Sequence, residues 1–168
     1  MSAIIAIDPG LTGAIATLVG GRLHVADMPT YTVRKATRVN LHDLAKIITD
    51  ARILGAFEAL VEHVGSMPKQ GVASAFNFGF TTGAIHGILA AHADIQTHTV
   101  TPAQWRFGVG LMRTENADKR DRKAASRARA IELFPDYAHL FARAKDDGRA
   151  DAALMAWWYV NKHTRAGA

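Results

Sequence analysis

The amino-acid sequence predicts an α/β fold in which a mixed, five-stranded central sheet is flanked by helices. Three strands of a meander are expected first, because apolar or alternating segments follow one another between glycines, with Gly20-Gly21 at a hairpin turn. Two later strands each follow a segment with helical spacing, an order typical of a sheet covered by helices. The predicted strands lie at residues 3–8, 13–19, 22–28, 57–61 and 95–100.

Apolar residues recur at helical spacing in several further segments. The predicted helices lie at residues 41–54, 71–92, 121–134 and 149–163, and a short helix opens at Thr101-Pro102. Two polar and basic segments, 29–40 and 111–120, are interpreted as loops. No linker or low-complexity stretch interrupts the chain, so residues 1–168 are expected to form a single domain.

The predicted helix at 71–92 carries a small residue at every fourth position. These residues are Gly71, Ala75, Gly79, Gly83, Gly87 and Ala91. Because glycine is a poor helix former, the stripe requires a packing reason, and close packing on the sheet of the same chain is favoured. A dimer contact is the alternative. Aromatic residues in this helix (Phe76, Phe78 and Phe80) and Trp105, Trp157 and Trp158 are expected to be core or packing residues.

The composition restricts the classes of function. The chain has 168 residues, of which 49% are hydrophobic and 21% charged, as in soluble globular proteins. It has no cysteine, which excludes disulfides and thiolate zinc sites and suits the cytoplasm. Neither a signal peptide nor a membrane span is expected. The net charge of +5 and the isoelectric point of about 9.8 favour a polyanionic partner.

Two predicted strands end in an acidic residue. Asp8 closes the apolar run Ala3–Ile7, and burying an isolated carboxylate is costly unless it has a partner, a metal or a catalytic role. Taken alone, capping of the following turn explains Asp8 equally well. Glu62 ends the strand at 57–61, and strand ends at one edge of an α/β sheet are where sites are usually built.

A further pair of acids begins the last predicted helix. A helix from about residue 147 places Asp147 and Asp151 one turn apart on one face, where their charges repel unless a cation lies between them. Asp147 also gains from the helix dipole. Together with Asp8 and Glu62 the pair can hold two Mg²⁺ ions, because Mg²⁺ prefers oxygen ligands. Two such ions support phosphodiester hydrolysis.

Basic residues are concentrated in 119–129, KRDRKAASRAR, with six basic side chains and one acid. Arg120, Lys123 and Arg127 share one helix face, which favours contact with phosphates. A smaller cluster, for which DNA contact and simple solvation both stay open, consists of Arg34, Lys35 and Arg38.

Four segments carry a resemblance to a known family: IIAIDPGLTGAIA, LVEHVGSMP, KRDRKAASRARAIELFP and DDGRADAALMAWW. In this order they resemble the first strand, the fourth strand, the basic helix of phage-encoded members and the final helix of the RuvC-type Holliday-junction resolvases. That family belongs to the ribonuclease-H-like nuclease superfamily. The resemblance implies that Asp8, Glu62, Asp147 and Asp151 are catalytic metal ligands and that Lys123 approaches the scissile phosphate.

The resemblance also implies an activity. It is that of a homodimeric crossover junction endodeoxyribonuclease of DNA recombination and repair, which cuts four-way junctions by paired symmetric nicks. Two Mg²⁺ ions per active site are expected, with Mn²⁺ as a substitute, in the cytoplasm of a bacterium or a phage-infected host. Three alternatives stay open: a nuclease for forks, flaps and D-loops, a ribonuclease-H-like nuclease for other substrates, and a non-catalytic DNA-structure-binding protein. An actin-like ATP-binding fold is disfavoured, because no second phosphate loop is visible.

The sequence departs from the family pattern in two places. The paired aspartates of the last helix are three residues apart in cellular members, whereas residue 148 here is glycine, so Asp147 is preferred over Asp146 as the partner of Asp151. The aromatic wedge residue after the glutamate is replaced by Gly65, and Met67 is the candidate wedge. The expected DNA-binding residues are Lys119, Arg120, Arg122, Lys123, Arg127, Arg34, Lys35, Arg38, Met67 and Lys69.

Overall fold

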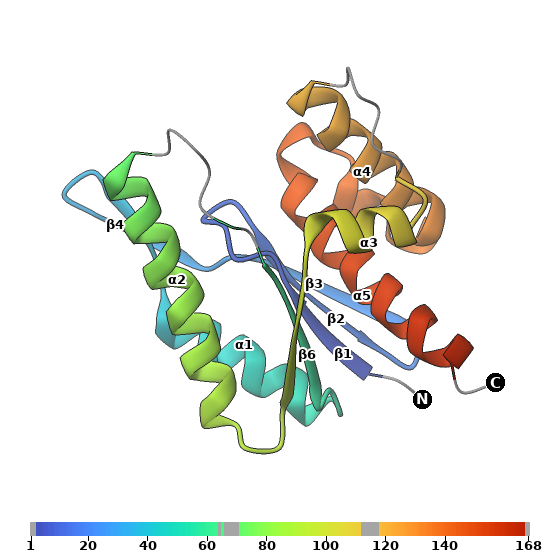
Figure 1. The fold of residues 1–168 in the computed structure, drawn as a ribbon, viewed down its shortest axis with the longest axis horizontal. Helices are drawn as coiled ribbons and strands as arrows, with labels where there is room; N and C mark the ends of the chain where they lie inside the picture. The colour runs from blue at the N-terminus through green and yellow to red at the C-terminus, as the bar shows by residue number, and fades with distance from the viewer. Residues whose placement is uncertain (1–2, 64, 66–70, 112–117, 167–168) are drawn as a thin grey trace.

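The computed structural model describes residues 3–63, 65, 71–111 and 118–166 (Figure 1). Its centre is a five-stranded sheet in the order β3-β2-β1-β6-β7. The strands are β1 (Ala3–Ile7), β2 (Ala14–Val19), β3 (Arg22–Asp27), β6 (Glu58–Glu62) and β7 (Gln96–Val100). The first three are antiparallel neighbours, whereas β6 runs parallel to β1 and β7 parallel to β6. The predicted mixed sheet is confirmed.

Helices cover both faces of the sheet, and the apolar side chains of β1 alternate between the two hydrophobic clusters that result. Ile5 and Ile7 pack with residues of α1 (Leu41–Ile53) and α2 (Val72–Ala91). Ile4 and Ala6 pack on the opposite face, which is covered by α3, α4 and α5 (Figure 1). These three helices span Pro102–Gly108, Lys119–Leu133 and Asp147–Ala166.

Helix α5 lies closest to the sheet, and its segment 152–156 is completely buried against β1 and β2. It begins at Asp147, two residues before the predicted start, and two short 3₁₀ helices, η1 (Pro135–Phe141) and η2 (Ala144–Asp146), connect it to α4. The earlier start places an acidic residue in the first turn, where the helix dipole favours it.

The segment 29–40, interpreted from the sequence as a loop, is a β-hairpin. Strands β4 (Thr30–Val33) and β5 (Ala36–Val39) pair antiparallel and form a separate two-stranded sheet. Arg34 and Lys35 form the two-residue turn with φ angles of 46° and 68°, the left-handed conformation that such hairpins require. The loop interpretation is therefore wrong. The sequence did not reveal the hairpin because its turn contains neither glycine nor asparagine, the residues that usually mark such turns.

The small residues of α2 do not pack on the sheet of their own chain. A Cβ atom added to Gly79, Gly83 or Gly87 would meet nothing within 4 Å among the described residues. The helix is instead anchored through its opposite face by Thr81, Ile85 and Leu89. The prediction that the stripe packs on the sheet of the same chain is therefore wrong.

No helix in the described part of the chain is long and apolar enough to cross a membrane.

Candidate active site

Two acidic side chains lie next to each other at one edge of the central sheet. Asp8 directly follows β1, and Glu62 is the last residue of β6. Because β1 and β6 are parallel neighbours with Ile7 opposite Val61, both chain positions come to the same sheet edge. The Asp8 carboxylate accepts a hydrogen bond of 3.2 Å from the Gly10 backbone N–H, so it caps its turn as well.

A contact between two glycines brings α5 onto this edge. A Cβ atom at Gly148 would lie 2.4 Å from the Thr12 carbonyl oxygen and 2.9 Å from the Cα atom of Gly13. Only residues without side chains permit this approach of backbone to backbone. The first turn of α5, and with it Asp147, therefore lies directly beside Asp8.

The four acids lie close enough together for their charges to raise the pKa of three of them. Burial first, then the charges of Glu62 and Asp147, raise the pKa of Asp8 to about 7. Burial likewise raises the pKa of Asp151 to about 7, with further contributions from Asp8 and Asp147. Burial and the charge of Asp151 also raise the pKa of Glu62.

Two cations face this group of acids. Lys123 of α4 forms an ion pair with Asp147, and its charge also acts to lower the pKa of Asp8. On the other side, Arg106 Nη1 of α3 lies 3.7 Å from Asp151 Oδ1. The structure thus brings together all five residues that the sequence analysis predicted as catalytic.

The contribution of α3 to the site was not predicted from the sequence. Trp105 is 1% exposed, and its indole N–H donates a hydrogen bond of 2.8 Å to Glu62 Oε1. Arg106 donates a hydrogen bond of 2.9 Å to the hydroxyl oxygen of Ser126, which is completely buried in α4. Trp105 does belong to the core, as predicted. A buried tryptophan also needs an acceptor for its N–H, and this need could have indicated a contact with a nearby carboxylate.

Asp146, the alternative partner of Asp151, is occupied elsewhere. It is 1% exposed and accepts hydrogen bonds from the Arg143 guanidinium and backbone, with Arg149 at 3.8 Å. The Arg143 guanidinium holds the pKa of Asp146 below its usual value. This carboxylate stabilises the start of α5, which favours Asp147 as the fourth acid of the site.

The donor set fits a hard divalent cation. Asp8, Glu62, Asp147 and Asp151 offer only carboxylate oxygens, the ligands that Mg²⁺ and Mn²⁺ take. Asp151 Oδ1 is buried and accepts no hydrogen bond among the described residues; the Arg106 guanidinium at 3.7 Å faces it without bonding to it, so this oxygen can still ligate a cation. Among the described residues, no three or more His, Asp or Glu side chains are already arranged closely enough to hold a metal ion.

The predicted DNA-binding residues of α4 divide into two groups. Arg120 and Arg122 are exposed, whereas Arg127 is half-buried and donates a hydrogen bond of 3.4 Å to the Ala144 carbonyl oxygen. The side chain of Lys119 lies outside the described residues, as do Met67 and Lys69. Gly65 is described and exposed.

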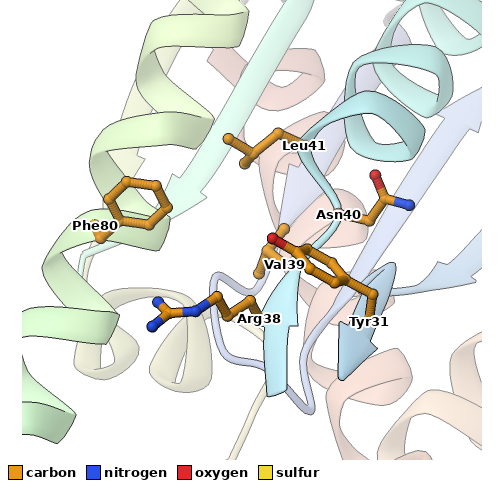
Figure 2. A pocket seen from close by; sticks show the side chains of 6 residues that line it. All are labelled: Tyr31, Arg38, Val39, Asn40, Leu41 and Phe80. Atoms are coloured by element: carbon orange, nitrogen blue, oxygen red, sulfur yellow. The ribbon is translucent and has the colours of Figure 1, made fainter. Parts of the chain in front are cut away.

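The second basic cluster lies on the β4–β5 hairpin. Arg34 and Lys35 are exposed at its turn, and Arg38 extends from β5 toward α2, where its Nη1 lies 3.5 Å from Asn77 Oδ1. Hairpin and helix enclose a surface hollow of about 450 Å³ with Tyr31 and Phe80 on its walls (Figure 2). A cation and exposed aromatic rings are the groups that contact nucleic acid strands.

The fold is the RuvC-type, ribonuclease-H-like fold, as the comparison with solved structures confirms. Thermus thermophilus RuvC in complex with a Holliday junction substrate matches with a TM-score of 0.58 and 14% identity over 98% of both chains. Another Thermus thermophilus RuvC structure gives 0.56 and 13%, over 96% of this chain and 97% of that one. The yeast mitochondrial Holliday junction resolvase gives 0.51 and 12%, over 98% of this chain and 82% of that one. No family model and no curated protein sequence matches the chain.

Proposed function

We propose that this protein is a Mg²⁺-dependent, structure-selective endodeoxyribonuclease that resolves four-way DNA junctions by paired, symmetric nicks. One observation carries the proposal. Asp8, Glu62, Asp147 and Asp151 meet at one sheet edge beside Lys123, and three of the four have a raised pKa. Perturbed carboxylates of this kind gather at functional sites. The fold, shared with solved Holliday junction resolvases, supports the same conclusion.

The four carboxylates would hold two Mg²⁺ ions, which when bound supply a nucleophile at neutral pH and stabilise the leaving 3′ oxygen. Asp8 and Asp151 must lose their protons to act as ligands, so binding strengthens as the pH rises through about 7. Lys123 reaches the site from α4 and can neutralise the charge that develops on the phosphate. Mn²⁺ is expected to substitute, because its ligand preference is similar.

DNA would lie against α4 and the β4–β5 hairpin. The basic residues of these elements contribute affinity through phosphate contacts, which carry little sequence information. They are Lys119, Arg120, Arg122, Lys123 and Arg127 of α4, and Arg34, Lys35 and Arg38 of the hairpin. Met67 and Lys69, which lie outside the described residues, stay candidates for DNA contact from the sequence.

The outer face of α2 supports the homodimer. Val72 and Phe76 are 87% and 69% exposed there, and the glycines Gly79, Gly83 and Gly87 leave the same face open. A helix that is apolar all round is normally buried, and a glycine stripe admits close approach of another helix. A second copy of the chain is the proposed occupant, and its two-fold symmetry matches that of a four-way junction.

The test uses a labelled, immobile four-way junction and a matched linear duplex, each with Mg²⁺ and with chelator. Paired, Mg²⁺-dependent nicks on opposite strands of the junction alone support the proposal. Equal cutting of forks, flaps, D-loops or RNA–DNA hybrids would keep the nuclease but remove the junction selectivity. Tight junction binding without any cutting would make the protein a non-catalytic structure-binding protein.

A further inference from the structure

We propose that helix α3 is a positioning element for the acidic cluster: Trp105 orients the Glu62 carboxylate, and Arg106 fixes α4 against α5. The inference rests on the proposed function, because it assigns these residues to metal binding at the same site. It adds three side chains to the proposed site: Trp105, Arg106 and Ser126. None of them is proposed to ligate the metal directly.

The place of Trp105 is set by the strand beside Glu62. Strand β7 pairs with β6 so that Val100 lies opposite Glu62, and α3 begins two residues later at Pro102, with Thr101 as its N-cap. Thr101 and Gln104 cap this helix reciprocally, so its first turn is fixed relative to the sheet. Trp105 follows in that turn and is buried in the hydrophobic cluster that the sheet forms with α4 and α5.

The hydrogen bond from Trp105 to Glu62 gives the carboxylate one orientation. The indole N–H is 2.8 Å from Glu62 Oε1, and the ring is 1% exposed, so neither partner can turn freely. Tryptophan donates but never accepts, and it stays neutral at every pH. It therefore orients Glu62 without competing with a cation for the carboxylate charge. Arg106 and Lys123, by contrast, contribute positive charge to the site.

Arg106 links three helices through one side chain. Its Nη1 donates to Ser126 Oγ at 2.9 Å, and its Nη2 donates to the Arg122 carbonyl oxygen at 3.2 Å, both on α4. Nη1 also lies 3.7 Å from Asp151 on α5. Its guanidinium lies 5.2 Å from the centre of the Trp105 ring, which holds it in place.

The two α4 contacts of Arg106 flank Lys123 along the helix. Arg122 immediately precedes Lys123, and Ser126 follows one turn later. The register of this turn fixes where the Lys123 side chain can reach, and its observed partner is Asp147. Arg106 thus acts on Lys123 through backbone and hydroxyl contacts, which need its planar fork and not only its charge.

Trp105→Phe tests the first half of the proposal, because it keeps an aromatic ring and removes only the N–H donor with part of the ring. Partners that orient metal ligands typically contribute about 10- to 100-fold in metal affinity. We expect Mn²⁺ affinity, measured by electron paramagnetic resonance without DNA, to fall by about tenfold. Trp157→Phe, a half-buried tryptophan on α5, is the matched control and should bind Mn²⁺ as wild type does. Trp105→Phe binding within twofold of wild type would overturn the proposal.

A double-mutant cycle shows whether Trp105 acts through Glu62. In a Glu62→Gln background, Trp105→Phe should cause no further loss of Mn²⁺ affinity. A second full tenfold loss there would assign the effect to general damage and refute the positioning role.

Two further measurements keep the proposal testable if Trp105→Phe does not fold. In the wild-type protein, one indole N–H resonance should shift both on addition of Mg²⁺ and in Glu62→Gln, while the other two stay unchanged; no shift in any indole signal would refute the role of Trp105. Arg106→Lys should cut junctions about tenfold more slowly, because the ammonium cannot make the paired contacts; full activity would refute the role of Arg106. Wild type that binds Mn²⁺ but cuts no DNA would refute the proposed function alone.

Discussion

Removing the charge of Asp8 should stabilise the metal-free protein while abolishing cleavage. Asp8→Asn keeps an amide oxygen for the Gly10 N–H and removes the repulsion from Glu62 and Asp147. The pKa of Asp8 rises from 3.8 to about 7 in the folded chain. At high pH the folded chain must therefore hold the Asp8 carboxylate in its ionised form, which its surroundings disfavour. Ionisation of Asp8 therefore destabilises the fold as the pH rises from about 4 to about 7.

The size of this effect follows from the difference between the two pKa values. About three pH units at about 1.4 kcal/mol each set a ceiling of about 4 kcal/mol. Asp8 is only half-buried and shares protons with its neighbours, so we expect about half of the ceiling, about 2 kcal/mol. For a domain of this length that corresponds to about 4–8 °C in melting temperature.

The assay is thermal unfolding followed by circular dichroism in chelator at pH 4 and pH 8. The two proteins should melt alike at pH 4, and Asp8→Asn should melt higher at pH 8. Addition of Mg²⁺ at pH 8 should then raise the melting temperature of the wild type more than that of the variant. Asp136→Asn, an exposed acid, serves as control. A lower melting temperature for Asp8→Asn at pH 8 in chelator would refute the account of the buried charge, and wild-type turnover by the variant would refute its catalytic role.

Three further substitutions test other parts of the site. Lys123→Ala should slow junction cleavage by about 100-fold in single-turnover assays with little change in gel-shift affinity; normal rates would make Lys123 a surface base. Gly148→Asp should lower stability by about 1–3 kcal/mol in urea titrations, because its Cβ would meet the Thr12 carbonyl oxygen at 2.4 Å; an unchanged midpoint would contradict the contact. Gly83→Leu should convert the proposed dimer to monomer in sedimentation experiments and replace paired nicks with single ones, whereas an unaltered dimer would place the interface elsewhere.

The central sheet could be predicted because its strands follow local rules. The continuous apolar run of β1 is what burial on both faces requires, and Gly20-Gly21 adopts the positive φ angles of a two-residue hairpin turn. The acids at the ends of β1 and β6 could be predicted for the same reason, since parallel neighbours bring their ends to one edge.

The β4–β5 hairpin and the role of α3 could not be predicted in this way. The hairpin turn uses Arg34 and Lys35 in left-handed conformations, which local propensity disfavours. The contact between Trp105 and Glu62 joins residues 43 positions apart, and nothing in the sequence around either residue specifies the other. Such contacts arise from the packing of α3 on α5, next to the end of β6, which only the folded chain defines.

The acidic pair of α5 shows how a backbone contact decides which side chains can carry the chemistry. The acids of the last helix are three residues apart in cellular members of the family that the chain resembles, whereas position 148 here is a glycine that packs on the Thr12 carbonyl oxygen. Residues three and four apart share one helix face, so an acid at 147 keeps the same side of α5 as Asp151. Asp146 is bound by Arg143 and lies outside that arrangement. The departure from the family spacing is therefore compatible with a complete set of four carboxylates, because the first turn of α5 is held directly on the turn that follows Asp8.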